Sequence, residues 1–213
     1  WSCTVGIDYA ELTDWAAVNL HFRQGAQRYD INHAWICRDA KTLPKIKAPW
    51  RAWVEAGHCT FVDDVSIHPR LLAGYIQQAA ARYNIVGVAM DKFRWTMMSE
   101  ALKEIGFDAN DRDRVHLVRP SDIMQLDPIV QDCFNRQLFT WGDNPALRWA
   151  VNNTKRVRSS KSLGVDTGNF IYAKIEWRSR KTDPWMALVA SMTIEEKLGD
   201  GGADAPMIGA FTF

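Results

Sequence analysis

Three aspartates of this chain stand where apolar segments begin or end, a position that suits metal ligands. Asp8 ends the short run VGI, Asp91 ends the run NIVGVAM, and Asp183 opens the apolar segment PWMALVASM. Neighbouring strands of a sheet lie about 5 Å apart, so carboxylates at their ends can share one ion. Carboxylate oxygens select hard cations such as Mg²⁺ or Mn²⁺. Two such ions about 4 Å apart can activate a water molecule and stabilise the leaving oxygen in phosphodiester cleavage. The pattern therefore predicts catalytic metal ligands, and the alternative for each acid is capping of a turn or helix.

A fourth acid, Asp14, lies six residues after Asp8 and is a second-tier metal candidate. Turn capping explains its position at least as well. The histidines offer a poor alternative centre. No histidine, including His58 and His68, stands four residues from another, which disfavours a zinc hydrolase.

The elements that must position these acids alternate between strand and helix patterns. Residues 3–8, 15–23 and 28–37 are typical of an antiparallel meander, and the continuous apolar run before Asp91 is typical of a central strand buried on both faces. Further strands are predicted at 115–118 and 170–177, and helices at 50–56, 67–83, 97–105, 121–137 and 183–198. This order predicts an α/β fold whose mixed sheet is flanked by helices.

Two helices carry recognisable start signals. Asp63 and Asp64 precede the helix predicted at 67–83, so at least one of them is expected to cap it. Asp183 and Pro184 together are a standard helix start, with the acid at the cap and proline at the first helical position.

The composition indicates one intracellular domain with no global sign of nucleic-acid binding. At 213 residues and 47% hydrophobic content the chain can bury a sizeable core, and its net charge is only +1. No signal peptide and no apolar run of roughly 20 residues is present, so a soluble protein is expected. No GxxxxGK[ST] motif occurs, which excludes ATP hydrolysis through a P-loop in this chain. The widely spaced cysteines are typical of buried thiols in a reducing cytosol; they are Cys3, Cys37, Cys59 and Cys133.

Positive charge is concentrated in one stretch of the chain, although the net charge of the whole chain is near zero. From residue 155 to residue 181 there are eight lysines and arginines against two acids, immediately before Asp183. Such runs are usually solvated faces, but beside a metal site this one is expected to follow a phosphate backbone. The candidate DNA contacts are Arg156, Arg158, Lys174 and Lys181. Four tryptophans could stack on bases, although packing in the core is the favoured interpretation; they are Trp141, Trp149, Trp177 and Trp185.

The order of these features resembles the ribonuclease H-like nuclease fold. More narrowly, the chain resembles the C-terminal nuclease domain of the large terminase subunit, the DNA-packaging motor of tailed bacteriophages. The matching stretches follow the family's order over nearly the whole chain, and the last two are the most specific: GIDYAELTDWAAV, AGHCTFVDD, VAMDKFRWTMMSEAL, WGDNPALRWAVNN and KTDPWMALVASM. The usual final motif of the family reads Ile-Asp-Gly, whereas here Thr182 precedes the acid and Pro184 follows it.

The resemblance implies a metal-dependent endonuclease that cuts double-stranded concatemeric DNA with little sequence specificity. Asp8 and Asp91 would share a first Mg²⁺ or Mn²⁺ ion, and Asp183 would complete a second. The nuclease domain would span residues 1–198 with an additional C-terminal β-hairpin, residues 199–213 would form a flexible tail, and the family's N-terminal ATPase domain is absent from this chain.

The resemblance also implies partners and a place of action. The expected partners are double-stranded DNA, the terminase small subunit and the portal protein, with no membrane. The expected location is the cytoplasm of the bacterial host, at the procapsid portal. Two alternatives stay open: another ribonuclease H-like nuclease, such as a junction resolvase or transposase core, and a catalytically silent DNA-binding or assembly module. A silent module would be expected to have lost at least one of the three acids.

Overall fold

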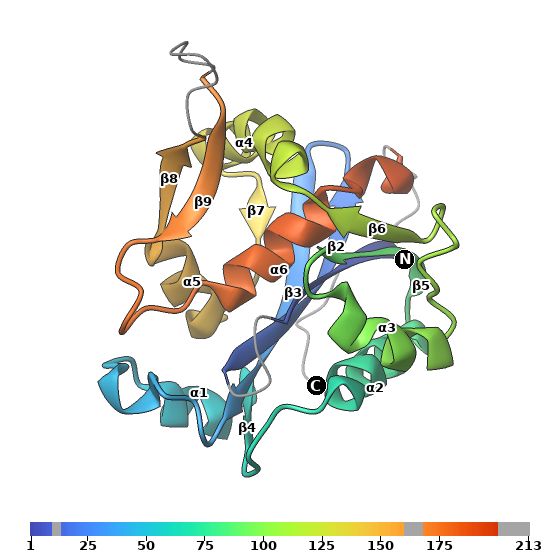
Figure 1. The fold of residues 1–213 in the computed structure, drawn as a ribbon. Helices are drawn as coiled ribbons and strands as arrows, with labels where there is room; N and C mark the ends of the chain where they lie inside the picture. Colours follow the sequence, from blue (N-terminus) through green and yellow to red (C-terminus); the bar gives the residue numbers. More distant parts are fainter. Residues whose placement is uncertain (10–13, 160–167, 200–213) are drawn as a thin grey trace.

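A mixed β-sheet forms the centre of the protein (Figure 1). The computed structural model describes residues 1–9, 14–159 and 168–199. Within these ranges seven strands form one sheet in the order β4-β3-β2-β1-β5-β6, with β7 beside β3, and β8 and β9 form a separate hairpin. The strands are β1 (Ser2–Tyr9), β2 (Trp15–Gln24), β3 (Gln27–Cys37), β4 (Cys59–Val62), β5 (Asn84–Asp91), β6 (Val115–Val118), β7 (Phe139–Thr140), β8 (Thr154–Arg158) and β9 (Phe170–Lys174). The helices are α1 (Trp50–Glu55), α2 (Pro69–Ala80), α3 (Trp95–Glu104), α4 (Pro120–Asn135), α5 (Pro145–Asn152) and α6 (Asp183–Met192).

The sheet has the mixed topology that the sequence predicts. β1, β2 and β3 pair as an antiparallel meander, and β5 joins β1 in parallel, followed by β6. Every residue of β5 from Val88 to Met90 is buried, as expected of a central strand. The predicted α/β class with a flanked mixed sheet and an additional hairpin near the C-terminal end is therefore confirmed.

The two faces of β1 serve different layers because successive side chains of a strand point to opposite sides. Cys3, Val5, Ile7 and Tyr9 belong to a core cluster that also holds side chains of α2. The residues between them face α6, which runs across the other side of the sheet (Figure 1).

Helix α6 lies unusually close to β1 because of a glycine. A Cβ atom at Gly6 would overlap the carbonyl oxygen of Ala187 and the backbone nitrogen of Ser191. One step earlier on the same face, the Thr4 hydroxyl donates to the Ser191 carbonyl oxygen at 2.9 Å. Only glycine permits this close approach at the centre of the interface.

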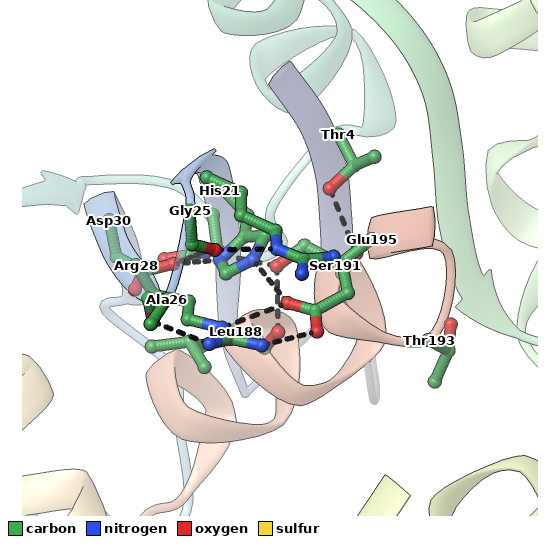
Figure 2. Close-up of polar contacts among 12 residues, drawn as sticks. Thr4, His21, Gly25, Ala26, Arg28, Asp30, Leu188, Ser191, Thr193 and Glu195 are labelled. Carbon is green, nitrogen blue, oxygen red and sulfur yellow. Dashed lines mark hydrogen bonds and ion pairs between the residues drawn. The ribbon is translucent and has the colours of Figure 1, made fainter. Parts of the chain in front are cut away.

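A buried ionic network ties the segment after α6 to β2 and β3 (Figure 2). The His21 ring lies between Asp30 at 2.8 Å and Glu195 at 3.1 Å, and Arg28 donates to both oxygens of Glu195, at 3.2 and 2.8 Å. Burial alone would lower the pKa of His21, but the two carboxylates outweigh it and raise that pKa to about 9. Burial likewise opposes ionisation of Glu195, yet hydrogen bonds from His21 and Arg28 lower its pKa to about 2. The network therefore holds complementary charges inside the protein.

The predicted aspartate cap of α2 is wrong. The N-cap is His68, whose ring nitrogen accepts a backbone N–H of the first turn at 3.2 Å. Asp63 instead pairs with Arg38 at 2.9 Å, and the Asp64 carboxylate accepts the N–H of Val65 at 2.6 Å. Pro69 at the helix start fixes the boundary later than the acids suggest.

Other boundaries also differ from the sequence prediction. α6 ends at Met192 rather than at residue 198, because Glu195–Leu198 forms a separate 3-10 turn, and its N-cap is Thr182, so Asp183 is the first helical residue. β9 ends at Lys174 rather than at residue 177. The short elements β4, β7 and α5 and the first hairpin strand β8 were not placed individually from the sequence.

Three further features concern the cysteines, membrane-spanning helices and the C-terminal tail. All four cysteines are buried free thiols, as predicted. None of the helices in the described part of the chain combines the length and apolarity needed to cross a bilayer. The predicted flexible tail lies outside the described residues except for Gly199.

Candidate metal centre

Strand register places Asp8 beside Asp91. β1 and β5 run parallel, and Ile7 is the partner of Met90 in the ladder. Asp8 and Asp91 are the next residue along each strand, so the two carboxylates leave the same edge of the sheet from strands about 5 Å apart. The neighbouring strand ends predicted from the sequence are confirmed.

Helix packing brings the third aspartate to the same face. Gly6 packs against Ala187 of α6. Asp8 is two residues further along β1, an advance of about 6.6 Å, and Asp183 is one helical turn of about 5.4 Å before Ala187. The two steps run in the same direction, so Asp183 starts its helix over the end of β1.

Asp183 is a buried carboxylate without a hydrogen-bond partner. Its residue is 1% exposed, and neither Oδ1 nor Oδ2 has a partner among the described residues. Burial raises its pKa; Lys174 and Lys181 oppose the shift, and Asp14 adds to it. Such a group is costly to keep charged without a cation or donors close by.

Asp8 shares this electrostatic environment. Burial raises its pKa well above the usual range, and repulsion from Asp183 and then from Asp91 and Asp14 adds to the effect. Lys174 on β9 opposes it. The half-buried Lys174 thus supplies positive charge to both Asp8 and Asp183, and its predicted contact with DNA stays a prediction.

Asp91 is the exposed member of the set. Its Oδ1 accepts the backbone N–H of Phe93 at 2.7 Å. The turn-capping role considered for this acid is therefore real, and it orients the carboxylate. Only one oxygen has this bond, so capping leaves the other available to a cation.

A pocket of about 400 Å³ opens beside Asp8 and Asp91. Its polar lining comes from these two carboxylates and Arg94. The remaining walls are largely apolar and come from β1, the turn after β5, β6, α4 and α6: Ile7, Phe93, Val118, Ile123, Met186, Val189 and Ala190. The two acids therefore have a space in which a substrate can reach them.

The carboxylates of Asp8, Asp91 and Asp183 suit a hard cation, although they do not yet surround one common metal position. Across residues 1–9, 14–159 and 168–199, no three His, Cys, Asp or Glu side chains already surround a common metal position. Carboxylates repel one another without an ion between them. The unpartnered oxygens of Asp183, together with Asp8 and the second oxygen of Asp91, are the ligand type that Mg²⁺ and Mn²⁺ take.

Asp14 and Lys181 form an ion pair next to this set. The Lys181 ammonium group contacts the Asp14 carboxylate, and the lysine residue is only 1% exposed. The Asn153 side chain also donates to the Lys181 carbonyl oxygen at 3.0 Å. The charge of Lys181 is thus buried against Asp14 in this arrangement, and the predicted contact of Lys181 with DNA phosphates stays a prediction. Sequence alone missed this, because lysine is rarely buried unless it is paired.

The basic hairpin divides into structural and exposed side chains. Arg156 makes a bidentate pair with Asp127 of α4 at 2.9 and 2.5 Å, and its guanidinium lies 4.0 Å from the Phe170 ring centre. Arg156 therefore anchors the hairpin to α4 while its residue stays exposed, and its predicted contact with DNA stays a prediction. Lys155 and Arg158 on the same strand are exposed.

The tryptophans mostly pack in the core, as expected. Trp185 is 2% exposed, Trp149 packs between Trp15 and Trp53, and Trp141 packs against the rings of Phe134 and Phe139. Trp177 is the exception, at 76% exposed.

The fold is shared with solved structures of phage large terminases. The crystal structure of the HK97 bacteriophage large terminase matches with a TM-score of 0.74 and 16% identity, over 90% of this chain and 39% of that one. The large terminase nuclease of the thermophilic phage G20c matches with a TM-score of 0.56 and 10% identity, over 91% and 82% of the two chains. The large terminase of another thermophilic bacteriophage, solved in complex with ATP-gamma-S, matches with a TM-score of 0.52 and 10% identity, over 90% and 40%.

These likenesses establish the fold. They confirm the predicted ribonuclease H-like architecture and its resemblance to the terminase nuclease domain. The chain spans 39% of the HK97 protein, so it corresponds in extent to a part of that larger chain. No family model and no curated protein sequence matches it.

Proposed function

We propose that this chain is a metal-dependent endonuclease that cuts double-stranded viral DNA during genome packaging. The observation that carries the proposal is the buried, unpartnered carboxylate of Asp183, set over the strand ends that bear Asp8 and Asp91. The terminase nuclease fold supports the same reaction class. A structural acid would be expected to have hydrogen-bond partners; a cation ligand would not.

Asp8 and Asp91 would hold a first ion, and Asp183 would complete the site for a second. Two Mg²⁺ or Mn²⁺ ions bound there would supply an activated water molecule and stabilise the leaving oxygen of the phosphodiester. The Phe93 N–H fixes the orientation of Asp91. Lys174 limits the repulsion between Asp8 and Asp183, so the carboxylates can stay close before a cation arrives. No serine, cysteine or histidine nucleophile is needed.

The DNA would lie across the exposed basic side chains of the hairpin towards the pocket. Lys155 and Arg158 are exposed on β8, and Lys174, the last residue of β9, is close enough to Asp8 and Asp183 to act on the pKa of both. Contacts from lysine and arginine to phosphates release counterions and carry no base information. Little sequence preference is expected from such a surface.

The wider setting follows from the same proposal. The full terminase would supply an ATP-driven motor, a small subunit and a portal contact, and packaging would take place in the bacterial cytoplasm at the procapsid. The HK97 neighbour and the neighbour solved with ATP-gamma-S are large terminases of which this chain covers 39% and 40%. No observation on the described residues favours a junction resolvase, a transposase core or a silent module.

The test is cleavage of supercoiled plasmid in Mg²⁺, Mn²⁺, Ca²⁺ or EDTA. Wild type should cut in Mg²⁺ or Mn²⁺ and not in EDTA, and the variants Asp8→Ala, Asp91→Ala and Asp183→Ala should each lose cutting by at least about a hundredfold. Asp143→Ala is the matched control, because that carboxylate is 95% exposed and pairs with the surface residue Arg148. Undiminished cutting by any of the three site variants would remove that acid from the catalytic set, and cutting in EDTA would refute the metal requirement.

A further inference from the structure

An aromatic ring stands exposed at the edge of the pocket. Phe93 follows Asp91 by two residues, lines the pocket and is 83% exposed. A phenyl ring left so open to water contributes nothing to the core, and large exposed apolar groups beside a cavity usually mark a binding surface.

The backbone holds this ring in a defined place relative to the Asp91 carboxylate. The Phe93 N–H donates to the Asp91 side chain at 2.7 Å, and the Arg94 N–H donates to the Asp91 carbonyl oxygen at 3.1 Å. The turn that orients the acid therefore also presents the ring. A molecule stacked on Phe93 lies within reach of the carboxylate.

The pocket has the size and lining for one flat group. Its volume of about 400 Å³ lies near the lower end of the roughly 300–1,000 Å³ typical of small-molecule sites. Apolar side chains from β6, α4 and α6 form its inner wall: Val118, Ile123, Met186, Val189 and Ala190. An aromatic lid, an apolar wall and acids at one side suit a planar ring attached to a reacting polar group.

An arginine without a partner adds the means to hold an anion. Arg94 lines the pocket and is half-buried, and among the described residues its side chain has no ion pair or hydrogen bond. Arginine binds phosphate oxygens through its planar fork of donors. The pocket therefore offers a stacking face and a phosphate ligand side by side.

We propose that this pocket takes one unstacked nucleobase of the DNA strand next to the cleaved phosphate, with Phe93 stacked on the base and Arg94 on the neighbouring phosphate. The proposal rests on the nuclease function above, because the pocket is continuous with Asp8 and Asp91. Charge complementarity favours a nucleotide over a protein segment, because Arg94 can bind an anion and the Phe93 ring can stack on any base.

A base in a fully paired duplex cannot enter, so the strand must open locally. Opening is easiest at a mismatched or already unpaired base. The pocket therefore predicts that the protein prefers DNA that is locally distorted, without reading its sequence.

Equilibrium binding in EDTA tests this without cleavage. Two fluorescent duplexes, one fully paired and one with a central mismatch, are titrated with the protein and followed by anisotropy. Wild type should bind the mismatched duplex roughly tenfold more tightly, which corresponds to about 1.4 kcal/mol. Phe93→Ala should lose this preference and Phe93→Trp should keep it, while Val65→Ala, at another exposed apolar residue, should leave it unchanged. The fluorescence of a 2-aminopurine at the mismatch should be quenched by wild type, Phe93→Trp and Val65→Ala, and not by Phe93→Ala.

Equal affinity of wild type for the two duplexes, or a preference that survives in Phe93→Ala, would overturn the proposal. Light scattering of the same variants tests whether a second copy of the chain covers Phe93 instead of DNA. Loss of self-association in Phe93→Ala with unchanged DNA binding would show that the ring contacts a second copy. Plasmid cleavage in Mg²⁺ run in parallel separates the two proposals. Wild-type cutting without a mismatch preference refutes the pocket alone, whereas a mismatch preference without any cutting refutes the nuclease.

Discussion

Replacing Asp183 by asparagine is expected to stabilise the metal-free protein while it removes cleavage. The carboxylate is buried, and neither of its oxygens has a hydrogen-bond partner among the described residues. An asparagine amide would be unpartnered there too, so the gain comes from removing the buried charge, whose cost without a partner is about 1–3 kcal/mol. Repulsion from Asp14 and Asp8 adds to this, and Lys174 and Lys181 offset part of it. Removing the charge should therefore raise the free energy of unfolding by about 1–3 kcal/mol. For a protein of this size, that is about 3–9 °C in Tm.

The effect should depend on pH in a defined direction. The pKa of Asp183 is raised in the folded protein, so wild type loses stability as the pH rises from the unfolded value of 3.8 through the folded pKa. Asparagine cannot ionise. The advantage of Asp183→Asn should accordingly be small at pH 4 and larger at pH 8.

Thermal unfolding in EDTA at pH 4, 6 and 8 measures this, with Asp143→Asn as the control at an exposed acid. Added Mn²⁺ should raise the Tm of wild type more than that of Asp183→Asn, because the variant loses the site for the second ion and keeps Asp8 and Asp91 for the first. A variant that is less stable than wild type at pH 8 in EDTA would show that Asp183 is a satisfied structural acid, contrary to the reasoning.

Three further predictions concern the framework and the DNA surface. The network around His21 should stabilise the fold fully only between about pH 4.5 and 6.5. The contribution of His21 is lost as the pH rises through about 9, and that of Glu195 is lost as the pH falls through about 2. In urea unfolding, His21→Gln should lack the loss of stability at alkaline pH. Gly6→Ala should lower the free energy of unfolding by at least about 3 kcal/mol, because its Cβ would meet the backbone of α6. Gly87→Ala should lower it by under about 1 kcal/mol, because its Cβ would meet the end of a flexible side chain at 3.0 Å. Equal Tm values for the two variants would contradict the close approach of α6 to β1. Arg158→Glu should weaken DNA binding and reduce the slope of log affinity against log salt by about one; an unchanged slope would move the DNA surface away from β8.

The strand ends that bear Asp8 and Asp91 could be predicted because periodicity and polarity both change there. An apolar run of strand length that stops at an acidic residue predicts the end of a buried strand. The sequence pattern made their adjacency a condition for sharing an ion, and the register shows that the two strands are neighbours. Asp183 could be placed at a helix start from Pro184 alone.

Other features depend on contacts that no local pattern encodes. Gly6 sits in an apolar run like any small strand residue, and only the packing of α6 shows why a side chain is excluded there. Lys181 lies in a basic stretch, yet it is buried because Asp14, 167 residues away in the chain, faces it. Phe93 follows an apolar strand in the sequence, and only the turn made by Asp91 shows that its ring points outward.

The position of Mn²⁺ in a crystal of this protein, located by its anomalous scattering, is the most direct measurement of the proposed site. At saturating Mn²⁺ the expected result is metal bound to carboxylate oxygens of Asp8, Asp91 and Asp183. Mn²⁺ bound elsewhere, with these three carboxylates free of metal, would contradict it.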